Sequence, residues 1–224
     1  TGVDFDQYKN MVGAFYMPKL VYMNVSVLKT LEERQYFSGF AEIMKHGLIR
    51  DSVFYVWLLE NMYEICDRDP DTLEEMVIRS SNIKKTVVEK DPMEQGERAL
   101  LNFGHTIGHA LEKAKNFALY HGECVALGCV AAAYISWKHE LLTMDEYYEI
   151  RDMFVPFQLP ISIDHIDPEE ILRLTKSDKK MDAGKIKFIL LKKVGKAVID
   201  TSVTDDDIRN AIKEIYFSDE DMTE

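Results

Sequence analysis

Residues 98–112, with the sequence RALLNFGHTIGHALE, carry two different stripes of side chains when they are wound as one α-helix. At about 100° per residue, four polar side chains fall within an arc of roughly 60°. They are Arg98, Asn102, His105 and His109. Apolar side chains cluster around the opposite side. A surface helix ordinarily turns acids and lysines outward, so this polar row predicts the wall of a functional site.

Helical spacing dominates the chain after Leu31. The expected helices cover 37–62 with a break near 50–51, 70–90, 98–118, 121–139, 144–154, 168–175 and 205–216. The segment 121–139 is rich in Ala, Val and Gly, which indicates a buried core helix. Two short strands, 186–191 and 197–200, turn at Val194–Gly195. The sequence therefore predicts a mainly α fold with a small β element.

The first 30 residues differ from the rest. Lys9–Pro18 is predicted as a loop, and Lys19–Val25 has the β-branched and aromatic content of a strand. A lone strand is unstable and must join a sheet formed elsewhere. We therefore expect this strand to pair with a sheet encoded before Thr1.

Composition and charge exclude several classes of function. The formal net charge of −12 argues against nucleic acid, because a surface that follows phosphates needs a basic face. It leaves a small anionic substrate open, since a few cations in one cleft can hold a phosphate. No apolar run approaches the length of a membrane span. Cys124 and Cys129 lie in an apolar run and are expected to be reduced core thiols, which favours the cytoplasm.

Histidines at helical spacing are the first candidate for chemistry. His105 and His109 are four residues apart, so both imidazoles project from one side of a helix, which is compatible with metal binding. A third imidazole could come from His121, in the sequence HGE. Histidines with a carboxylate compose a divalent-metal site with an open position. The alternative is a pair of ordinary hydrogen-bonded residues on a helix.

A second cluster lies in SGFAEIMKHG, residues 38–47. Glu42 and Lys45 are three apart and share a helical face. They form either a surface ion pair or, because the stretch is so apolar, a site in which Glu42 is a further ligand. Several basic residues and one acid, each read alone, are typical of a solvated surface: Lys84, Lys85, Glu94, Arg98, Lys179 and Lys180.

Five ordered blocks between Lys9 and Leu191 together resemble the 3-dehydroquinate synthases. They are KNMVGAFYMP, SGFAEIMKHG, KKTVVEKDPMEQGERALLNFGHTIGHALE, HGECVALG and DKKMDAGKIKFILL. The resemblance implies the multi-helical C-terminal metal- and substrate-binding domain of the dehydroquinate synthase-like fold over residues 31–224. Residues 1–30 would end an N-terminal α/β nucleotide-binding domain, whose glycine-rich turn is not in this sequence. We therefore expect a part of a longer enzyme that is inactive on its own.

The resemblance also implies roles for individual residues. Zinc or cobalt would be held by Glu42, His105 and His121. The catalytic residues would be His109, which handles protons, Lys45, and Glu94, which supports the site electrostatically. The substrate would be bound by Lys84, Arg98, Asn102, Asn10 and Lys179, with Lys180 as an alternative to Lys179. NAD would contact Lys9, Val27, Leu28, Lys29 and Thr30.

The implied reaction is the second step of the shikimate pathway, which leads to chorismate and the aromatic amino acids. DAHP, a seven-carbon phosphorylated keto acid, is oxidised at C5 by NAD and loses phosphate by elimination. It is then reduced again and closes by an aldol step to 3-dehydroquinate. A metal acidifies the hydroxyl, a histidine takes its proton, and cations neutralise the anion. A homodimer is expected for the full-length enzyme.

Three other functions remain open from the sequence. Related sugar-phosphate cyclases act on sedoheptulose 7-phosphate or glucose 6-phosphate, whereas Lys84, Arg98 and Asn102 together favour a substrate with a carboxylate. Metal-dependent polyol dehydrogenases share the two-domain architecture, but their histidine pattern differs from LNFGHTIGHALE. A non-catalytic metal-binding domain is the third. A glycine-rich α/β domain encoded before Thr1 would favour an enzyme over that last alternative.

Overall fold

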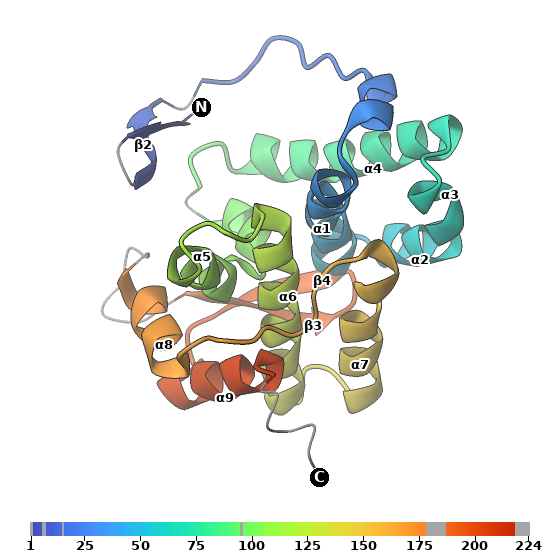
Figure 1. Ribbon diagram of the computed structural model, residues 1–224. Helices are drawn as coiled ribbons and strands as arrows, with labels where there is room; N and C mark the ends of the chain where they lie inside the picture. The colour runs from blue at the N-terminus through green and yellow to red at the C-terminus, as the bar shows by residue number, and fades with distance from the viewer. Residues whose placement is uncertain (1, 6–7, 15, 95, 178–186, 218–224) are drawn as a thin grey trace.

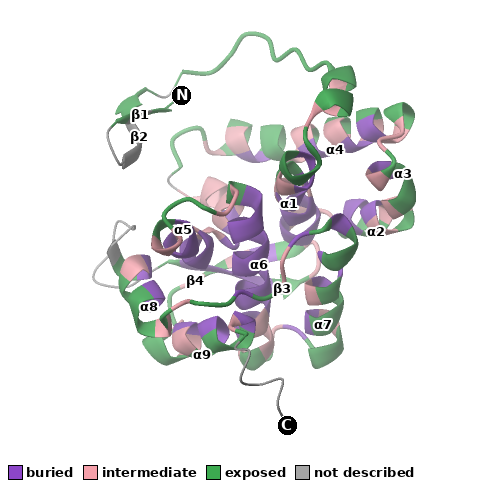
Figure 2. Cartoon of the chain, in the orientation of Figure 1, coloured by how far each residue is buried: buried purple, intermediate pink, exposed green. Residues whose placement is uncertain are grey.

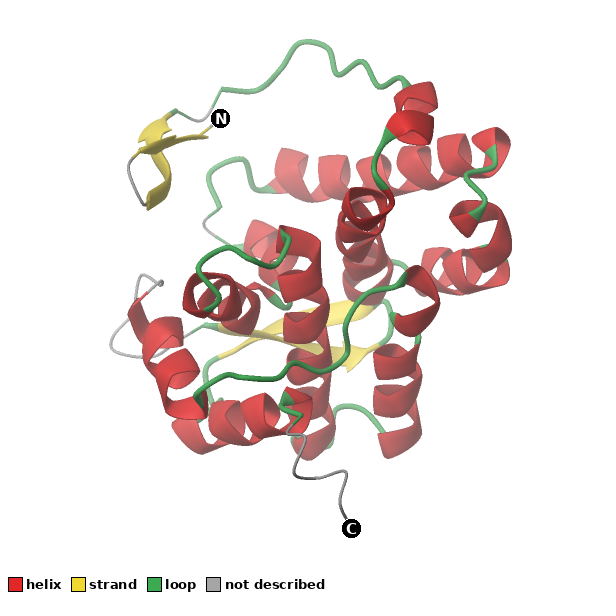
Figure 3. Cartoon of the chain, in the orientation of Figure 1, coloured by secondary structure: helices red, strands yellow, loops and turns green. Residues whose placement is uncertain are grey.

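Helices account for most of the computed structural model, which describes residues 2–5, 8–14, 16–94, 96–177 and 187–217 (Figures 1 and 3). The α-helices are α1 (Glu33–Arg50), α2 (Ser52–Glu60), α3 (Met62–Cys66), α4 (Pro70–Lys90), α5 (His105–Ala114), α6 (His121–Lys138), α7 (Met144–Asp152), α8 (Pro168–Ser177) and α9 (Asp205–Ile215). Three 3₁₀ helices are η1 (Val25–Thr30), η2 (Glu97–Asn102) and η3 (Val155–Phe157). The strands are β1 (Gly2–Phe5), β2 (Tyr8–Gly13), β3 (Phe188–Lys193) and β4 (Lys196–Asp200). The predicted mainly α fold is confirmed.

Helix α6 forms the centre of the core. It is buried along nearly its whole length, and α1, α5, α7, α9 and β3 pack around it (Figure 2). Its Ala- and Val-rich sequence has no polar stripe, and a helix that is apolar on all sides is stable only when surrounded. Cys124 and Cys129 are buried free thiols on this helix, as predicted.

The predicted hairpin packs beneath α6. Strands β3 and β4 are antiparallel, with Phe188 opposite Asp200, and Gly195 turns between them with φ +82°. The first four residues of β3 are buried. The backbone N–H of Leu191 donates to Ser136 Oγ at 3.0 Å, which ties the hairpin to the central helix.

The prediction for the first 30 residues was wrong in its details. Lys19–Val25 is not a strand: residues 19–24 belong to no helix or strand and are exposed, and Val25 begins η1. Strand β2 (Tyr8–Gly13) covers the first part of Lys9–Pro18, which was predicted as a loop, and pairs antiparallel with Gly2–Phe5. A strand needs a hydrogen-bonded neighbour, and Gly2–Phe5 supplies one close in the sequence to Tyr8–Gly13.

The stretch 98–118 is not one helix, and that prediction was also wrong. It is divided into η2 and α5 by Phe103 and Gly104. Gly104 adopts φ +78°, a conformation that glycine reaches without the steric cost a Cβ atom brings. The polar row found in the sequence therefore comes from two short helices that meet at a bend.

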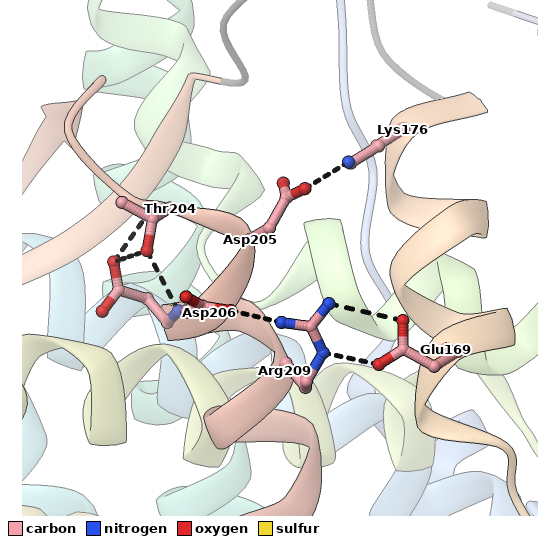
Figure 4. Close-up of polar contacts among 7 residues, drawn as sticks. Glu169, Lys176, Thr204, Asp205, Asp206 and Arg209 are labelled. Carbon is pink, nitrogen blue, oxygen red and sulfur yellow. Dashed lines mark hydrogen bonds and ion pairs between the residues drawn. The ribbon is translucent and has the colours of Figure 1, made fainter.

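Helices α8 and α9 lie side by side at the surface, with charged residues along their contact (Figure 4). Arg209 pairs with Glu169 and Asp206, and Lys176 pairs with Asp205. Exposed ion pairs contribute only about 0–1 kcal/mol each. The packing of α8 on α9 therefore depends mainly on the buried apolar residues of the two helices, which are Ile171, Leu172, Ile208, Ala211, Ile212 and Ile215.

Replacing Gly128 with alanine is expected to destabilise the fold by about 3 kcal/mol or more. A Cβ atom there would lie 1.8 Å from the carbonyl oxygen of Gly104, so α5 and α6 would have to separate. Urea denaturation followed by circular dichroism measures the change. Gly39→Ala is the matched control, because nothing lies within 4 Å of its added Cβ. Alanine there should stabilise α1 by roughly 0.5–1 kcal/mol, and equal stability of the two variants would contradict the close approach.

Candidate metal centre

Three helices each contribute one residue to a cluster of potential metal ligands. Glu42 lies on α1, while His105 and His121 are the first residues of α5 and α6. The helices can approach closely because α6 begins with His121–Gly122. A Cβ atom on Gly122 would lie 1.7 Å from the carbonyl oxygen of Ser38, so only glycine allows α6 to meet α1 here.

The three side chains converge on one point. Glu42 Oε1 lies 3.3 Å from His105 Nε2 and 3.1 Å from His121 Nε2. One ligand atom from each residue lies within 4.8 Å of the other two. One carboxylate and two imidazoles form the donor set of a zinc-type site with three protein ligands and an open position. The side chains present therefore fit a divalent transition metal.

The outer nitrogens of both imidazoles are oriented by the protein. His105 Nδ1 donates to the carbonyl oxygen of Phe103 at 3.1 Å, so its Nε2 lone pair faces Glu42. His121 Nδ1 lies 3.8 Å from Glu112 Oε2. Metal-binding histidines ordinarily have such partners on the other ring nitrogen. Glu112 was missed in the sequence, although its position seven after His105 places it on the same helical face.

Lys45 is buried against the cluster. Its Nζ donates to Glu42 Oε2 at 2.5 Å, and its side chain is only 3% exposed. The predicted pair therefore exists, but it is not a surface pair. Burial would raise the pKa of Glu42, yet the adjacent imidazoles of His105 and His121 and the charge of Lys45 hold that pKa well below its ordinary value. The carboxylate is thus ionised, as a metal ligand must be.

His105 is itself kept neutral. Burial lowers the pKa of its imidazole, and the charge of Lys45 lowers it further, while the adjacent carboxylate of Glu42 acts in the opposite direction. A neutral imidazole offers the lone pair that a metal requires.

His109 lies next to the cluster but outside it. Its ring centroid is 5.1 Å from that of His105 and 6.0 Å from that of His121. His109, Glu112 and His121 also bring one ligand atom each within 4.8 Å of one another. His105 and His109 thus lie side by side, as their spacing predicts, but belong to two different groups of potential ligands that share His121.

Three further predicted site residues gather in the bend that follows α4. Asn102 Nδ2 donates to Glu94 Oε1 at 3.0 Å, and Glu94 is exposed with φ +56°. The backbone N–H of Arg98 donates to Asp91 Oδ2 at 3.0 Å, and its Nη1 donates to the carbonyl oxygen of Pro92 at 2.7 Å. Because η2 packs on α4 and α1, this bend is held close to the helix that carries Glu42.

Lys84 is exposed on α4, the helix that packs on α1. Its charge contributes to the lowered pKa of His46, which is about 4 chiefly because that imidazole is buried. His46 Nδ1 lies 2.8 Å from Ser80 Oγ, so His46 is a hydrogen-bonded core residue between the two helices.

The remaining predicted residues lie elsewhere. Val27, Leu28, Lys29 and Thr30 belong to η1, which packs on α4. Lys9 and Asn10 belong to β2. Lys179, like Lys180, lies outside the described residues.

Sequence comparison decides the family. The sequence model of the 3-dehydroquinate synthase C-terminal domain matches residues 39–181, more than half of the chain. That of the 3-dehydroquinate synthase N-terminal domain matches residues 1–38. The chain belongs to the 3-dehydroquinate synthase family.

Individual members of the 3-dehydroquinate synthase family are similar over almost all of this chain. The 3-dehydroquinate synthase of Acetivibrio thermocellus is 42% identical over 207 residues, which are 92% of this chain and 58% of that protein. The 3-dehydroquinate synthase of Symbiobacterium thermophilum is 42% identical over 212 residues, covering 93% of this chain and 59% of that protein. The chain therefore spans less than two thirds of the length of these relatives.

Solved structures of sugar-phosphate cyclases share the fold. The 2-epi-5-epi-valiolone synthase of Streptomyces hygroscopicus, with NAD+ and Zn2+ bound, superposes with a TM-score of 0.87 at 25% identity over 96% of this chain and 60% of that one. A 2-deoxy-scyllo-inosose synthase complexed with carbaglucose-6-phosphate, NAD+ and Co2+ gives a TM-score of 0.79 at 26% identity, over 95% of this chain and 61% of that one. The dehydroquinate synthase-like fold is therefore confirmed.

No helix in the described part of the chain is both long and apolar enough to cross a membrane.

Proposed function

We propose that this chain is the metal- and substrate-binding part of a 3-dehydroquinate synthase, which converts DAHP to 3-dehydroquinate and phosphate with NAD. One observation carries the proposal: Glu42, His105 and His121 converge beside the buried Lys45 in a member of this family. A cluster of ionised carboxylate and neutral imidazole is suited to a catalytic metal rather than to structure alone.

The metal would be zinc or cobalt, held by Glu42, His105 and His121, and NAD would be the second cofactor. Support comes from the donor set and from the two cyclase structures, which contain NAD+ with Zn2+ or Co2+. When bound, the ion would lower the pKa of a substrate hydroxyl, and NAD would accept and return a hydride.

We assign proton transfer to His109, because its imidazole lies beside the metal ligands without being one of the converging three. Lys45 would lie against a substrate hydroxyl together with Asn102. Glu94 would support the site electrostatically and, in this structure, accepts a hydrogen bond from Asn102.

The other proposed contacts divide between the charged groups of the substrate and the cofactor. Arg98 and Lys84 would neutralise the carboxylate, and Asn10 and Lys179 would hold the phosphate. NAD would contact the segment Val27–Thr30 and Lys9. These assignments rest on the matching sequence blocks.

We also propose the larger organisation of the enzyme. Residues 1–30 would end an α/β nucleotide-binding domain and residues 31–224 would form the helical domain, as a family match divided at residues 38 and 39 supports. The full-length enzyme would be a homodimer, which sedimentation tests. Buried reduced thiols support a cytoplasmic location.

Another sugar-phosphate cyclase is the second candidate, because the structural neighbours are enzymes of that kind. Two observations favour a 3-dehydroquinate synthase. The relatives with that name are 42% identical to this chain, whereas the two cyclases are 25% and 26% identical. The trio of Lys84, Arg98 and Asn102 also suits a substrate with a carboxylate.

A phosphate-release assay of the full-length protein tests the proposal. With zinc or cobalt and NAD, we expect turnover of DAHP but not of sedoheptulose 7-phosphate or glucose 6-phosphate. Removal of the metal with a chelator should stop the reaction, and added zinc or cobalt should restore it. Turnover of a sugar phosphate in place of DAHP would favour the second candidate, and turnover of none of the three would exclude both.

A further inference from the structure

Arg68 occupies a backbone position that favours glycine. It lies just after α3 with φ +59°. Its N–H donates to the carbonyl oxygen of Ile65 at 3.1 Å, and the N–H of Asp69 donates to that of Glu64 at 2.9 Å. This pair of hydrogen bonds is the Schellman arrangement, in which a left-handed residue, most often glycine, ends a helix. An arginine here bears a conformational cost that its side-chain contacts must offset.

The side chain of Arg68 binds the end of η1. Its Nη1 donates to three main-chain carbonyl oxygens, those of Leu28 at 3.0 Å, Lys29 at 3.2 Å and Leu31 at 2.8 Å. The last carbonyls of a helix lack partners within it, and the dipole there favours a positive charge. The guanidinium thus caps η1 from a different part of the chain.

The guanidinium is held in place from a third element. Its central carbon lies 4.5 Å from the ring centroid of Tyr36, on α1, in a cation–π contact. Tyr36 Oη in turn donates to the carbonyl oxygen of Ile65 at 2.6 Å. Arg68 and Tyr36 therefore connect α1, α3 and η1.

The 3₁₀ helix η1 has few apolar contacts that fix it. None of its six residues is fully buried, and of these six Leu28 alone packs, partly buried, against the core, so apolar packing contributes less to its position than it does for the buried helices. Segments with few buried contacts open locally at low energetic cost. The charge-assisted hydrogen bonds of Nη1, whose two hydrogens are shared among the three carbonyl oxygens, are consequently a large share of what fixes η1 on the domain.

We propose that Arg68 is a positioning residue that holds η1 in the conformation that binds NAD. The inference rests on the proposed function, in which the segment Val27–Thr30 contacts the cofactor. Arg68 acts through the η1 backbone: without the guanidinium, η1 samples other positions, and only a fraction of the molecules can bind NAD. The apparent affinity falls by that fraction.

The test uses the full-length protein loaded with zinc and the variant Arg68→Gly. Glycine suits the left-handed backbone, so the variant removes the guanidinium without threatening the fold. If about a tenth of the molecules keep η1 in place, the Kd for NAD measured by calorimetry rises about tenfold. The KM for NAD should rise equally while kcat at saturating NAD changes little. Arg68→Lys, with one charged nitrogen near the same carbonyls, should recover part of the affinity.

Amide hydrogen exchange reports on η1 independently of NAD. In Arg68→Gly, the amides of residues 25–31 should exchange faster than in the unmodified protein. Arg79→Ala is the matched control: this guanidinium lies 4.9 Å from the ring centroid of Trp57 and pairs with Glu75 on α4. It should leave both exchange and the Kd unchanged.

The outcomes separate the two proposals. NAD binding by the unmodified protein with an equal Kd for Arg68→Gly would overturn the role of Arg68 and leave the proposed function intact. Unchanged exchange over residues 25–31 would overturn it as well. Failure of the unmodified protein to bind NAD would overturn the proposed function and, with it, the role of Arg68.

Discussion

Replacing His105 with alanine is expected to abolish metal binding by this chain. The variant keeps Glu42 and His121 but loses one of three converging donors, and two ligands hold a divalent ion far less tightly. Outer partners of metal-binding histidines already contribute about 10–100-fold in affinity, so loss of a direct ligand should exceed about a hundredfold. Zinc content after purification and a competition titration with a chelating dye measure the effect.

His165→Ala is the matched control for this experiment. His165 is 82% exposed and its nearest acidic partner is its neighbour Asp164, at 3.7 Å. This variant should retain about one ion for each chain, as a site with three protein ligands predicts. A His105→Ala protein that folds normally by circular dichroism and still binds zinc with full affinity would exclude His105 as a ligand.

Replacing His109 with alanine should leave the metal in place and remove the turnover. In the full-length enzyme, we expect the rate of phosphate release from DAHP to fall about 10²–10⁴-fold, which is the usual contribution of a general acid or base. The reason is the position of His109. Its imidazole lies beside those of His105 and His121, whereas the short contacts of Glu42 are with His105 and His121. Stopped-flow detection of phosphate together with metal analysis measures both quantities.

The contrast between the two variants is the informative result. His139→Gln serves as a control, since His139 lies just after the last residue of α6, with its Nε2 3.3 Å from Asp207 Oδ2. It should keep near-normal turnover. Near-normal turnover in His109→Ala would remove His109 from the mechanism, and loss of zinc from that variant would place it among the ligands.

Helix periodicity and terminal residues predicted much of the fold. Pro70 and Asp91 predicted the two ends of α4, and the structure begins and ends that helix at Pro70 and Lys90. The segment after His121, rich in Ala, Val and Gly, predicted a buried helix, and α6 is buried along nearly its whole length. Periodicity and helix-end residues act on neighbours within a few positions, so they can be recognised from the sequence alone.

Features that depend on distant contacts could not be predicted in this way. The left-handed turn at Gly104 is set by the close approach of α6, where the Sγ of Cys129 would lie 2.6 Å from an added Cβ atom. Periodicity alone therefore predicted one continuous helix through Gly104. Likewise, the composition of Lys19–Val25 indicated a strand, but strand formation depends on a partner.

The site was predicted in part for the same reason. Spacing brought His105 and His109 together, and the convergence of Glu42, His105 and His121 joins three helices that are far apart in the sequence. These three residues were predicted together only because the five sequence blocks resemble the 3-dehydroquinate synthases. Burial of Lys45 and the approach of Glu112 to His121 depend on how α1, α5 and α6 pack, which neither spacing nor composition reports.

The glycines between these helices have a consequence for how the site responds to a ligand. Gly122 places the backbone of α6 against that of α1, and Gly104 and Gly108 place α5 against α6. The backbones of α1, α5 and α6 are therefore in direct contact at these glycines, close to the residues that carry Glu42, His105 and His121. Such a site is stiff and preorganised, so a bound ion would freeze little additional motion, and most of the interaction energy would appear as affinity.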